Sequence, residues 1–198
     1  SRINRIFEGT NELNRLLAVD TTIKRALKGE LKMFEEAEKI LDNIGKMPFE
    51  KNNNQDYYEN KKSHIHNFKQ AILMIIAAAS RHFNKKLEPE QEIMMNISDM
   101  MMYLYAIEST LLRVNKLESQ KGADYVILYK DILDISTFDT SSIIYKSGLD
   151  AISSFAEGDY FKQLEASLKH YTNVEPVNVK EARRRIADKL IEENRYCF

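Results

Sequence analysis

Apolar residues recur along this chain at steps of three and four, the spacing that places side chains on one face of an α-helix. The pattern is sharpest between residues 88 and 121, where it alternates four- and three-residue steps as in the buried seam of a long bundle helix. The seam positions are Ile93, Ile97, Met100, Leu104, Ile107, Leu111 and Val114. A second stripe predicts a wider buried face and consists of Met94, Met101, Ile107 and Leu112. We therefore expect a long helix that packs against several others.

Another long helix is predicted for residues 56–86, where an apolar stripe includes Ile65, Phe68 and Phe83. Within residues 71–79 the chain is apolar on every side, which is typical of a helix surrounded by other helices. Pro89 then suits the first turn of the following helix, where no backbone N–H is needed. These two helices are the expected centre of a bundle.

The same spacing predicts six shorter helices. They cover residues 10–28, 30–43, 123–135, 140–156, 160–171 and 179–193. Gly29 and Gly158 follow two of them directly or closely and are expected to stop them. The last helix is expected to bury Val179, Ala182, Ile186 and Leu190. No segment alternates with period two, so the predicted fold class is all-α, a bundle of up to eight helices with two long central ones.

Residues 46–55 interrupt the helical pattern. Pro48 breaks a helix, and the run of Asn residues that follows favours turns, so this stretch is predicted to be a loop. It is the preferred boundary between a first part, residues 1–45, and a second part, residues 46–198. Gly29 is a rival position for that boundary.

Composition and charge exclude several classes of protein. The 198 residues include 29 Lys and Arg and 30 Asp and Glu, and the net charge of -1 gives no electrostatic reason to expect nucleic acid as a partner. Cys197 is the single cysteine, so no disulfide within the chain is possible and a reducing compartment is expected. No N-terminal stretch of this sequence has the basic-then-apolar form of a secretion signal, and the longest apolar run, residues 71–79, is too short to span a bilayer.

The first seventeen residues hold the one arrangement that suggests chemistry. Glu8 stands directly before Gly9 and Thr10, and Thr10 is a good N-cap for the helix that follows. Glu12 falls in the first turn, where the helix dipole favours an acid. A carboxylate at such a turn is able to act as a base if an apolar pocket raises its pKa. The alternative is a helix start with an exposed acid, since short motifs match by chance.

The stretch Ile-Phe-Glu-Gly-Thr at residues 6–10, within a longer match from Arg2 to Leu17, resembles the signature near the C-terminus of the acyl-CoA dehydrogenase family. The one departure is Leu13, where Ile is commoner in the family. The resemblance implies an FAD-dependent enzyme that removes the α-proton of an acyl-CoA thioester while the β-hydrogen leaves as hydride to the flavin. It also implies electron-transfer flavoprotein, or an equivalent acceptor, as a partner.

The family roles carry over to individual motif residues. Glu8 resembles the catalytic base. Phe7 and Gly9 match positions that line the acyl thioester, and Thr10, Asn11 and Glu12 match the segment that touches the FAD. On this resemblance residues 1–45 are expected to be the C-terminal end of the catalytic domain. No metal is implied.

A looser resemblance covers the second part of the chain. Tyr103-Leu104-Tyr105-Ala106-Ile107 with Leu112-Arg113, Pro89 and the terminal Phe198 look like the extra C-terminal helical domain of very-long-chain acyl-CoA dehydrogenases and of long-tailed bacterial members. That likeness implies a homodimer, with residues 46–198 lying over it and contacting a membrane. It implies a cytoplasmic location in a bacterium, or the mitochondrial matrix in a eukaryote, peripheral to the inner membrane.

Two functional hypotheses follow from these resemblances. In the first, the chain is a C-terminal fragment of an acyl-CoA dehydrogenase that supplies Glu8 and is inactive by itself, since the family's other domains would precede Ser1. In the second, residues from about 46 onward form a non-catalytic interaction or oligomerisation module. The hypotheses are compatible, because one concerns the reaction and the other the contribution of the tail.

Other candidate sites each have a plainer alternative. His64 and His66 are two residues apart, which does not suit a helical metal pair, so solvated or capping roles are expected. The basic run at residues 183–185 is a candidate for contact with anionic lipid or with the phosphates of CoA, and a salt-bridged exposed face is the alternative. Residues 122–140 are an equal candidate for membrane contact through Val126, Ile127 and Leu128. The Met-rich stretch from 94 to 102 suits a pliable binding surface or simple core packing.

Overall fold

The structure, a computed structural model, describes residues 2–44 and 56–198. The described residues form seven α-helices and two short 3₁₀-helices, and they contain no strand, which confirms the all-α prediction. In order these are η1 (Ile3–Arg5), α1 (Asn11–Leu27), α2 (Met33–Asp42), α3 (Tyr57–His82), α4 (Gln91–Lys121), η2 (Asp124–Val126), α5 (Ile127–Ser153), α6 (Gly158–Tyr171) and α7 (Val179–Glu193). The predicted loop at residues 46–55, and with it the preferred boundary, lies outside the described residues.

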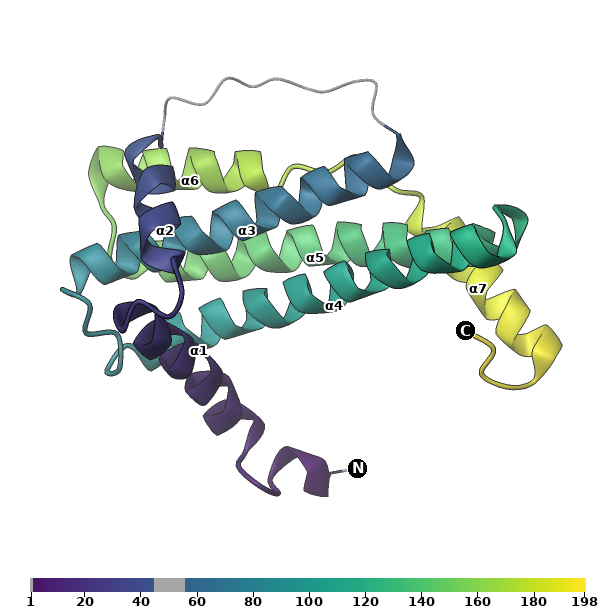
Figure 1. Ribbon diagram of the computed structural model, residues 1–198, viewed down its shortest axis with the longest axis horizontal. Coiled ribbons are helices and arrows are strands. Elements are labelled where there is room, and N and C mark those ends of the chain that lie inside the picture. Colours follow the sequence, from purple (N-terminus) through teal and green to yellow (C-terminus); the bar gives the residue numbers. More distant parts are fainter. Residues whose placement is uncertain (1, 45–55) are drawn as a thin grey trace.

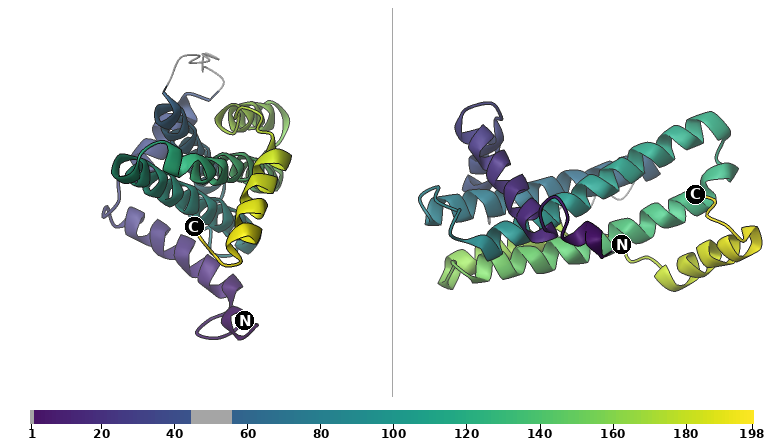
Figure 2. Two further views of the ribbon diagram at one scale, coloured as in Figure 1. Left: turned by 90° about the vertical axis from the view of Figure 1, so that its right-hand side faces the viewer. Right: turned by 90° about the horizontal axis from the view of Figure 1, so that it is seen from below.

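Three long helices, α3, α4 and α5, run side by side and form the centre of the bundle (Figure 1). The connection through η2 is short, so α4 and α5 form a helical hairpin and share the most extensive contact in the molecule. The remaining helices cover this centre from different sides. Helix α2 packs on α3, α1 crosses α4, α6 lies against α3 and α5, and α7 packs on α5 (Figures 1 and 2).

The seam on α4 is confirmed. Six of its seven positions are buried and Leu104 is half-buried. Within the Met-rich stretch, Met94 and the seam residue Met100 are buried, which confirms core packing for these two members. The second stripe is wrong at Leu112, whose exposure is 62%. One residue is about 100° of helix rotation, so Leu112 stands on the flank of α4, away from the face that Leu111 buries.

Residues 71–79 of α3 are as enclosed as their composition predicted, because all of them except the half-buried Leu73 are buried. The largest enclosed side chains come from all three central helices. They include Phe68, Met74 and Ile75 from α3, Ile97 and Ile107 from α4, and Leu133, Ile144 and Ile152 from α5. One continuous core therefore joins the three long helices.

The prediction of two helices at 123–135 and 140–156 is wrong. A single helix, α5, runs from Ile127 to Ser153 through the polar residues expected to interrupt it. The hydroxyl of Thr137 donates to the carbonyl oxygen of Leu133 at 2.7 Å, and that of Ser142 donates to the carbonyl of Phe138 at 3.4 Å. These bonds to the preceding turn satisfy the hydroxyls inside the helix, so the polar stretch does not end it.

Two predictions about helix ends and one about burial are wrong. Gly158 begins α6 instead of closing the preceding helix. Helix α2 begins at Met33, because the residues after α1 first form a turn in which the N–H of Glu30 donates to the carbonyl of Arg25. Helix α7 has the expected bounds, but only Ala182 of its four expected core residues is buried, since α7 packs mainly against α5.

Candidate active site

The motif residues lie on an N-terminal arm that extends away from the bundle (Figures 1 and 2). The arm consists of η1, a turn at Glu8 and Gly9, and the start of α1. Its apolar side chains are exposed: Ile3, Ile6 and, at 65%, Phe7. The arm thus presents both the motif and an apolar surface to its surroundings.

Backbone geometry defines the turn. Glu8 has φ of +55° and Gly9 has φ of +93°, so both lie in the left-handed region. Such a conformation costs a residue with a Cβ about 1–2 kcal/mol, whereas glycine adopts it readily. The side-chain amide of Asn14 donates to the carbonyl oxygen of Gly9 at 3.2 Å, and a Cβ on Gly9 would stand 2.9 Å from Oδ1 of Asn14. Position 9 therefore favours glycine.

Thr10 caps α1 as its sequence position predicts. The backbone N–H of Leu13 donates to Oγ1 of Thr10 at 3.2 Å. Backbone hydrogen bonding and then the Thr10 hydroxyl lower the pKa of the Glu12 carboxyl in the first turn. Further along, Nε of Arg15 lies 2.6 Å from Oδ1 of Asp99 and ties α1 to α4. The cap and this ion pair hold the motif at one end of α1.

All six motif residues, 7 to 12, are brought together on this one turn. Glu8 is exposed, and the described residues form no apolar pocket around its carboxylate. Exposed Asn11 and the half-buried Thr10 stand at a helix N-terminus beside Gly9, which has no side chain. These residues therefore stand together on a solvent-accessible turn at the start of α1.

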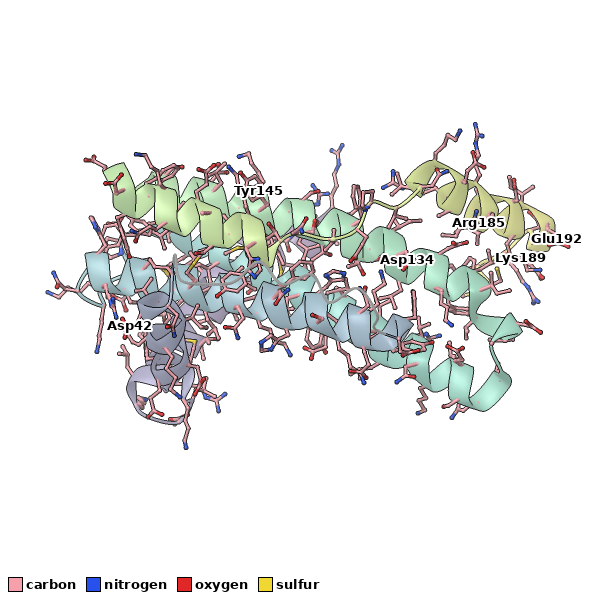
Figure 3. The ribbon with its side chains drawn as sticks, turned by 90° about the horizontal axis from the view of Figure 1, so that it is seen from above. Asp42, Asp134, Tyr145, Arg185, Lys189 and Glu192 are labelled. Atoms are coloured by element: carbon pink, nitrogen blue, oxygen red, sulfur yellow. The ribbon has the colours of Figure 1, made fainter. Side chains whose placement is uncertain are left out.

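A polar network between α3 and α5 was not predicted from the sequence. Nζ of Lys61 lies 2.8 Å from Oδ1 of Asp134, and the Tyr57 hydroxyl donates to the same oxygen at 2.9 Å. Figure 3 labels Asp134 on α5. Burial, and then the Asp134 charge, raise the pKa of Tyr57. Because each polar group has a partner, the network is a structural one. The only signal in the sequence was the i, i+4 spacing of Tyr57 and Lys61.

A second cluster adjoins this network. The Tyr58 hydroxyl donates to the carboxylate of Glu118, and Nζ of Lys130 lies 2.9 Å from the same carboxylate. The Lys130 ammonium also stands 5.0 Å from the centre of the Tyr57 ring. These contacts join the first turn of α3 to the hairpin formed by α4 and α5.

Of the two roles expected for the histidines, solvation is wrong for His64. Its exposure is only 7%, and Nε2 lies 2.8 Å from Oε2 of Glu175 in the connection between α6 and α7. Burial lowers the pKa of His64 despite this carboxylate. His66, two residues on, is exposed as expected. His64 therefore fastens a connecting segment to α3.

The basic run on α7 is salt-bridged, which favours the plainer of its two interpretations. Arg183 pairs with Asp139 at 2.9 Å and Arg185 pairs with Asp131 at 2.6 Å, both on α5, whereas Arg184 pairs with Glu181 of its own helix at 3.2 Å. Figure 3 labels Arg185, Lys189 and Glu192 along α7. Two of the three arginines hold α7 against α5.

The end of the molecule near the C-terminus carries exposed aromatic and aliphatic side chains. They are Tyr125, Ile127, Ile191 and, at 80% exposure, Tyr196. Beside them lies a cavity of about 600 Å³ whose lining includes Tyr129 and Phe198. The expectation that Val126 reaches a lipid interface is wrong, because Val126 is fully buried, while its neighbour Ile127 is exposed.

Two searches of the described residues gave negative findings. In residues 2–44 and 56–198, no three His, Cys, Asp or Glu side chains are grouped so that they could hold a metal ion. Over the same residues, no helix is both long enough and apolar enough to cross a membrane.

Comparison with known proteins gives concordant results. A family model described as acyl-CoA dehydrogenase, C-terminal domain, matches residues 67–170. A probable acyl-CoA dehydrogenase of Bacillus subtilis (strain 168) is 34% identical over 199 residues, which is 99% of this chain and 33% of that protein. The crystal structure of an acyl-CoA dehydrogenase complexed with FAD from Bacillus anthracis matches with a TM-score of 0.91 and 32% identity, over 100% of this chain and 33% of that one. This chain thus spans about a third of the length of these relatives, and it belongs to the acyl-CoA dehydrogenase family.

Proposed function

We propose that this chain is the C-terminal part of an FAD-dependent acyl-CoA dehydrogenase and supplies its catalytic base, Glu8. The observation that carries the proposal is the Glu-Gly-Thr turn at the start of α1, which presents an exposed carboxylate at the end of an arm with exposed apolar side chains. The relatives support it, since one is named a probable acyl-CoA dehydrogenase and another is an acyl-CoA dehydrogenase complexed with FAD. The substrate is a fatty acyl-CoA thioester.

In this proposal the Glu8 carboxylate accepts the proton from the α-carbon of the thioester. FAD, when bound, supplies the acceptor for the hydride that leaves the β-carbon, so that an α,β double bond forms. Phe7 and Gly9 lie against the thioester, and Thr10, Asn11 and Glu12 line the flavin edge. The exposed arm by itself does not exclude water from Glu8. We therefore infer that the isolated chain is inactive and that the other domains enclose the carboxylate, which would raise its proton affinity.

The test is Glu8→Gln in the whole flavoprotein. The amide keeps the size of the side chain but accepts no proton, so we expect turnover of acyl-CoA to fall by about 10²–10⁴-fold, the usual range for a general base. The flavin absorbance should remain. Glu35→Gln, at an exposed position in the first turn of α2, is the matched control and should leave turnover unchanged. Normal turnover of the Glu8 variant would refute the role of Glu8.

The division of roles within the chain is also proposed. Residues 1–45 carry the chemistry, and residues 46–198 form a helical tail that supports a homodimer. The two parts share one core, because α1 packs on α4 and α2 packs on α3, so the proposed division is one of roles. Electron-transfer flavoprotein or an equivalent acceptor would reoxidise the flavin.

A peripheral membrane contact is a second proposed property, in a bacterial cytoplasmic setting. The exposed cluster of Tyr125, Ile127, Ile191 and Tyr196 supports it, since tyrosines are enriched at membrane interfaces. In a vesicle sedimentation assay Ile127→Ser/Ile191→Ser should release the whole protein from anionic vesicles. Leu112→Ser, at an exposed leucine of α4 outside this cluster, is the control. Equal binding of all three proteins would exclude this surface.

A further inference from the structure

A second cavity, of about 390 Å³, opens between α1, the connection from α3 to α4, and the start of α4. Ile23, Leu87 and Met94 form part of its wall, and all three are otherwise buried in the core. Leu27, the last residue of α1, lines it from a half-exposed position. The volume is in the lower part of the range of ligand pockets, about 300–1,000 Å³. The wall is thus apolar, and the cavity is open to solvent.

The charged groups around the opening are unequally paired. Nζ of Lys24 lies 2.8 Å from Asp20 and 3.1 Å from Glu88, so the two acids that line the cavity share one cation. These hydrogen bonds raise the pKa of Lys24, which keeps it charged. Lys85 and Lys86 also line the cavity and are exposed, and neither forms an ion pair with a carboxylate of the described residues. The ammonium group of Lys85 stands 5.8 Å from the centre of the Phe34 ring. The lining thus holds three ammonium groups and two carboxylates, so the opening carries one positive charge in excess.

The backbone holds these two lysines in place. Asn84 and Lys85 have φ of +50° and +64°, so two successive non-glycine residues adopt the left-handed conformation after α3. The N–H of Lys85 donates to the carbonyl of Ser80 at 2.7 Å, and that of Lys86 donates to the carbonyl of Phe83 at 2.9 Å. Leu87 follows at once and is buried. The lysines consequently stand next to the apolar wall.

We propose that this cavity binds an amphipathic anion with one unbranched alkyl chain, such as an alkyl carboxylate. The anionic group would bind the ammonium groups of Lys85 and Lys86, and the chain would lie against Ile23, Leu87 and Met94. No aromatic ring lines this cavity, which disfavours a nucleobase. The motif lies at the opposite end of α1, a helix of 17 residues that is about 25 Å long. This inference is accordingly independent of the proposed reaction.

The probe is decanoate below its micelle concentration, added to the whole protein with ¹³C-labelled methionine methyl groups. Met94 lies in the cavity wall, and its signal is identified by its loss in Met94→Leu. We expect this signal to shift saturably with decanoate. Decan-1-ol and decyltrimethylammonium should shift this signal to the same extent only at concentrations at least about tenfold higher. They lack the anionic group to which the lysine ammonium groups would donate charged hydrogen bonds. Binding of decanoate elsewhere, such as at an acyl-CoA site, would not move this signal.

Two variants complete the experiment. Lys85→Gln/Lys86→Gln should weaken decanoate binding by roughly tenfold or more, whereas Lys116→Gln/Lys180→Gln removes the same charge at exposed positions on α4 and α7 and should leave binding unchanged. Leu27→Trp should fill the opening and abolish the shift. Equal binding of decanol, or an unchanged response in Leu27→Trp, would overturn the proposal. None of these readouts depends on Glu8 or on flavin.

Discussion

Gly148 belongs to α5 and lies where this helix contacts α3 and α6. The space at this position is too small for a side chain. A Cβ there would stand 2.8 Å from Cδ1 of Ile75 and 2.9 Å from both terminal methyls of Leu168. Both of these side chains are buried in the shared core, where neighbours have little freedom to move. At the residue scale, a single missing methyl group thus sets how closely three helices pack.

Gly148→Val is expected to lower the free energy of unfolding by about 1–3 kcal/mol, because the added carbons overpack a filled core. Chemical denaturation measures the effect. Ser142→Val, at an exposed position of the same helix, is the control for the helix propensity of valine and should cost less than about 1 kcal/mol. Equal losses in the two variants would show that packing around Gly148 is not tight.

His64 predicts a dependence of stability on pH. Its ordinary pKa of 6.5 is lowered in the folded protein, chiefly by burial, so the folded state favours the neutral ring. The stability that this contributes is complete above pH 6.5 and is lost as the pH falls through the lowered folded value. Between about pH 7.5 and about pH 5 the protein should therefore lose more stability than His64→Gln does. Parallel pH profiles of the two proteins, measured by thermal unfolding, would contradict this account.

At the scale of elements, the polar network of Lys61, Asp134 and Tyr57 joins α3 to α5. Lys61 is almost fully buried, and Asp134 keeps limited solvent contact. Breaking such a pair costs more than the pair contributes, because the remaining charge stays buried without a partner. The network accordingly specifies how α3 and α5 align.

Asp134→Ala should lower the free energy of unfolding by about 2–4 kcal/mol, somewhat below the range for fully buried pairs. Adding Lys61→Met removes the unpaired charge and should restore a large part of that loss. Asp150→Ala is the control, since it breaks an exposed pair with Lys146 at 2.5 Å, and such pairs contribute at most about 1 kcal/mol. Failure of the second substitution to restore stability would assign the loss to something other than the Lys61 charge.

The elements that could be predicted are those with a continuous apolar stripe. The α4 seam from Ile93 to Val114 and the turn before α1 follow from local pattern and capping chemistry. The unbroken α5 could not be predicted, because the hydroxyl of Thr137 is satisfied only once the helix has formed. The burial of His64 and the exposure of Leu112 depend on which helices pack nearby. Neither position carries that information in its own sequence neighbourhood.

At the scale of the whole molecule, α1 and α2 act as a cover for the three long helices. Val19 and Ile23 of α1, together with Ala37, Ile40 and Leu41 of α2, belong to the same core as α3 and α4. A bundle without these helices would expose a broad apolar face. The candidate site at the start of α1 is consequently attached to the core of the tail.

A protein limited to residues 56–198 should therefore be less stable than the full chain and should bind more of the dye ANS, which reports exposed apolar surface. Each fully buried aliphatic side chain contributes about 1.5–3 kcal/mol, so the loss should amount to several kcal/mol. A chain that ends before α7, at residue 178, is the matched control, since α7 packs mainly on α5 and buries one of its own residues, Ala182. Equal stability of residues 56–198 and the full chain would show that α1 and α2 are dispensable.

The docking of α1 on a distant helix has a consequence for synthesis on the ribosome. Arg15 meets Asp99, 84 residues later, so the apolar face of α1 leaves the ribosome long before its partner exists. At about 5–20 residues per second, the wait is roughly 4–17 s, since 84/20 ≈ 4 and 84/5 ≈ 17. During that interval the apolar face of α1 is accessible to chaperones and to other nascent chains.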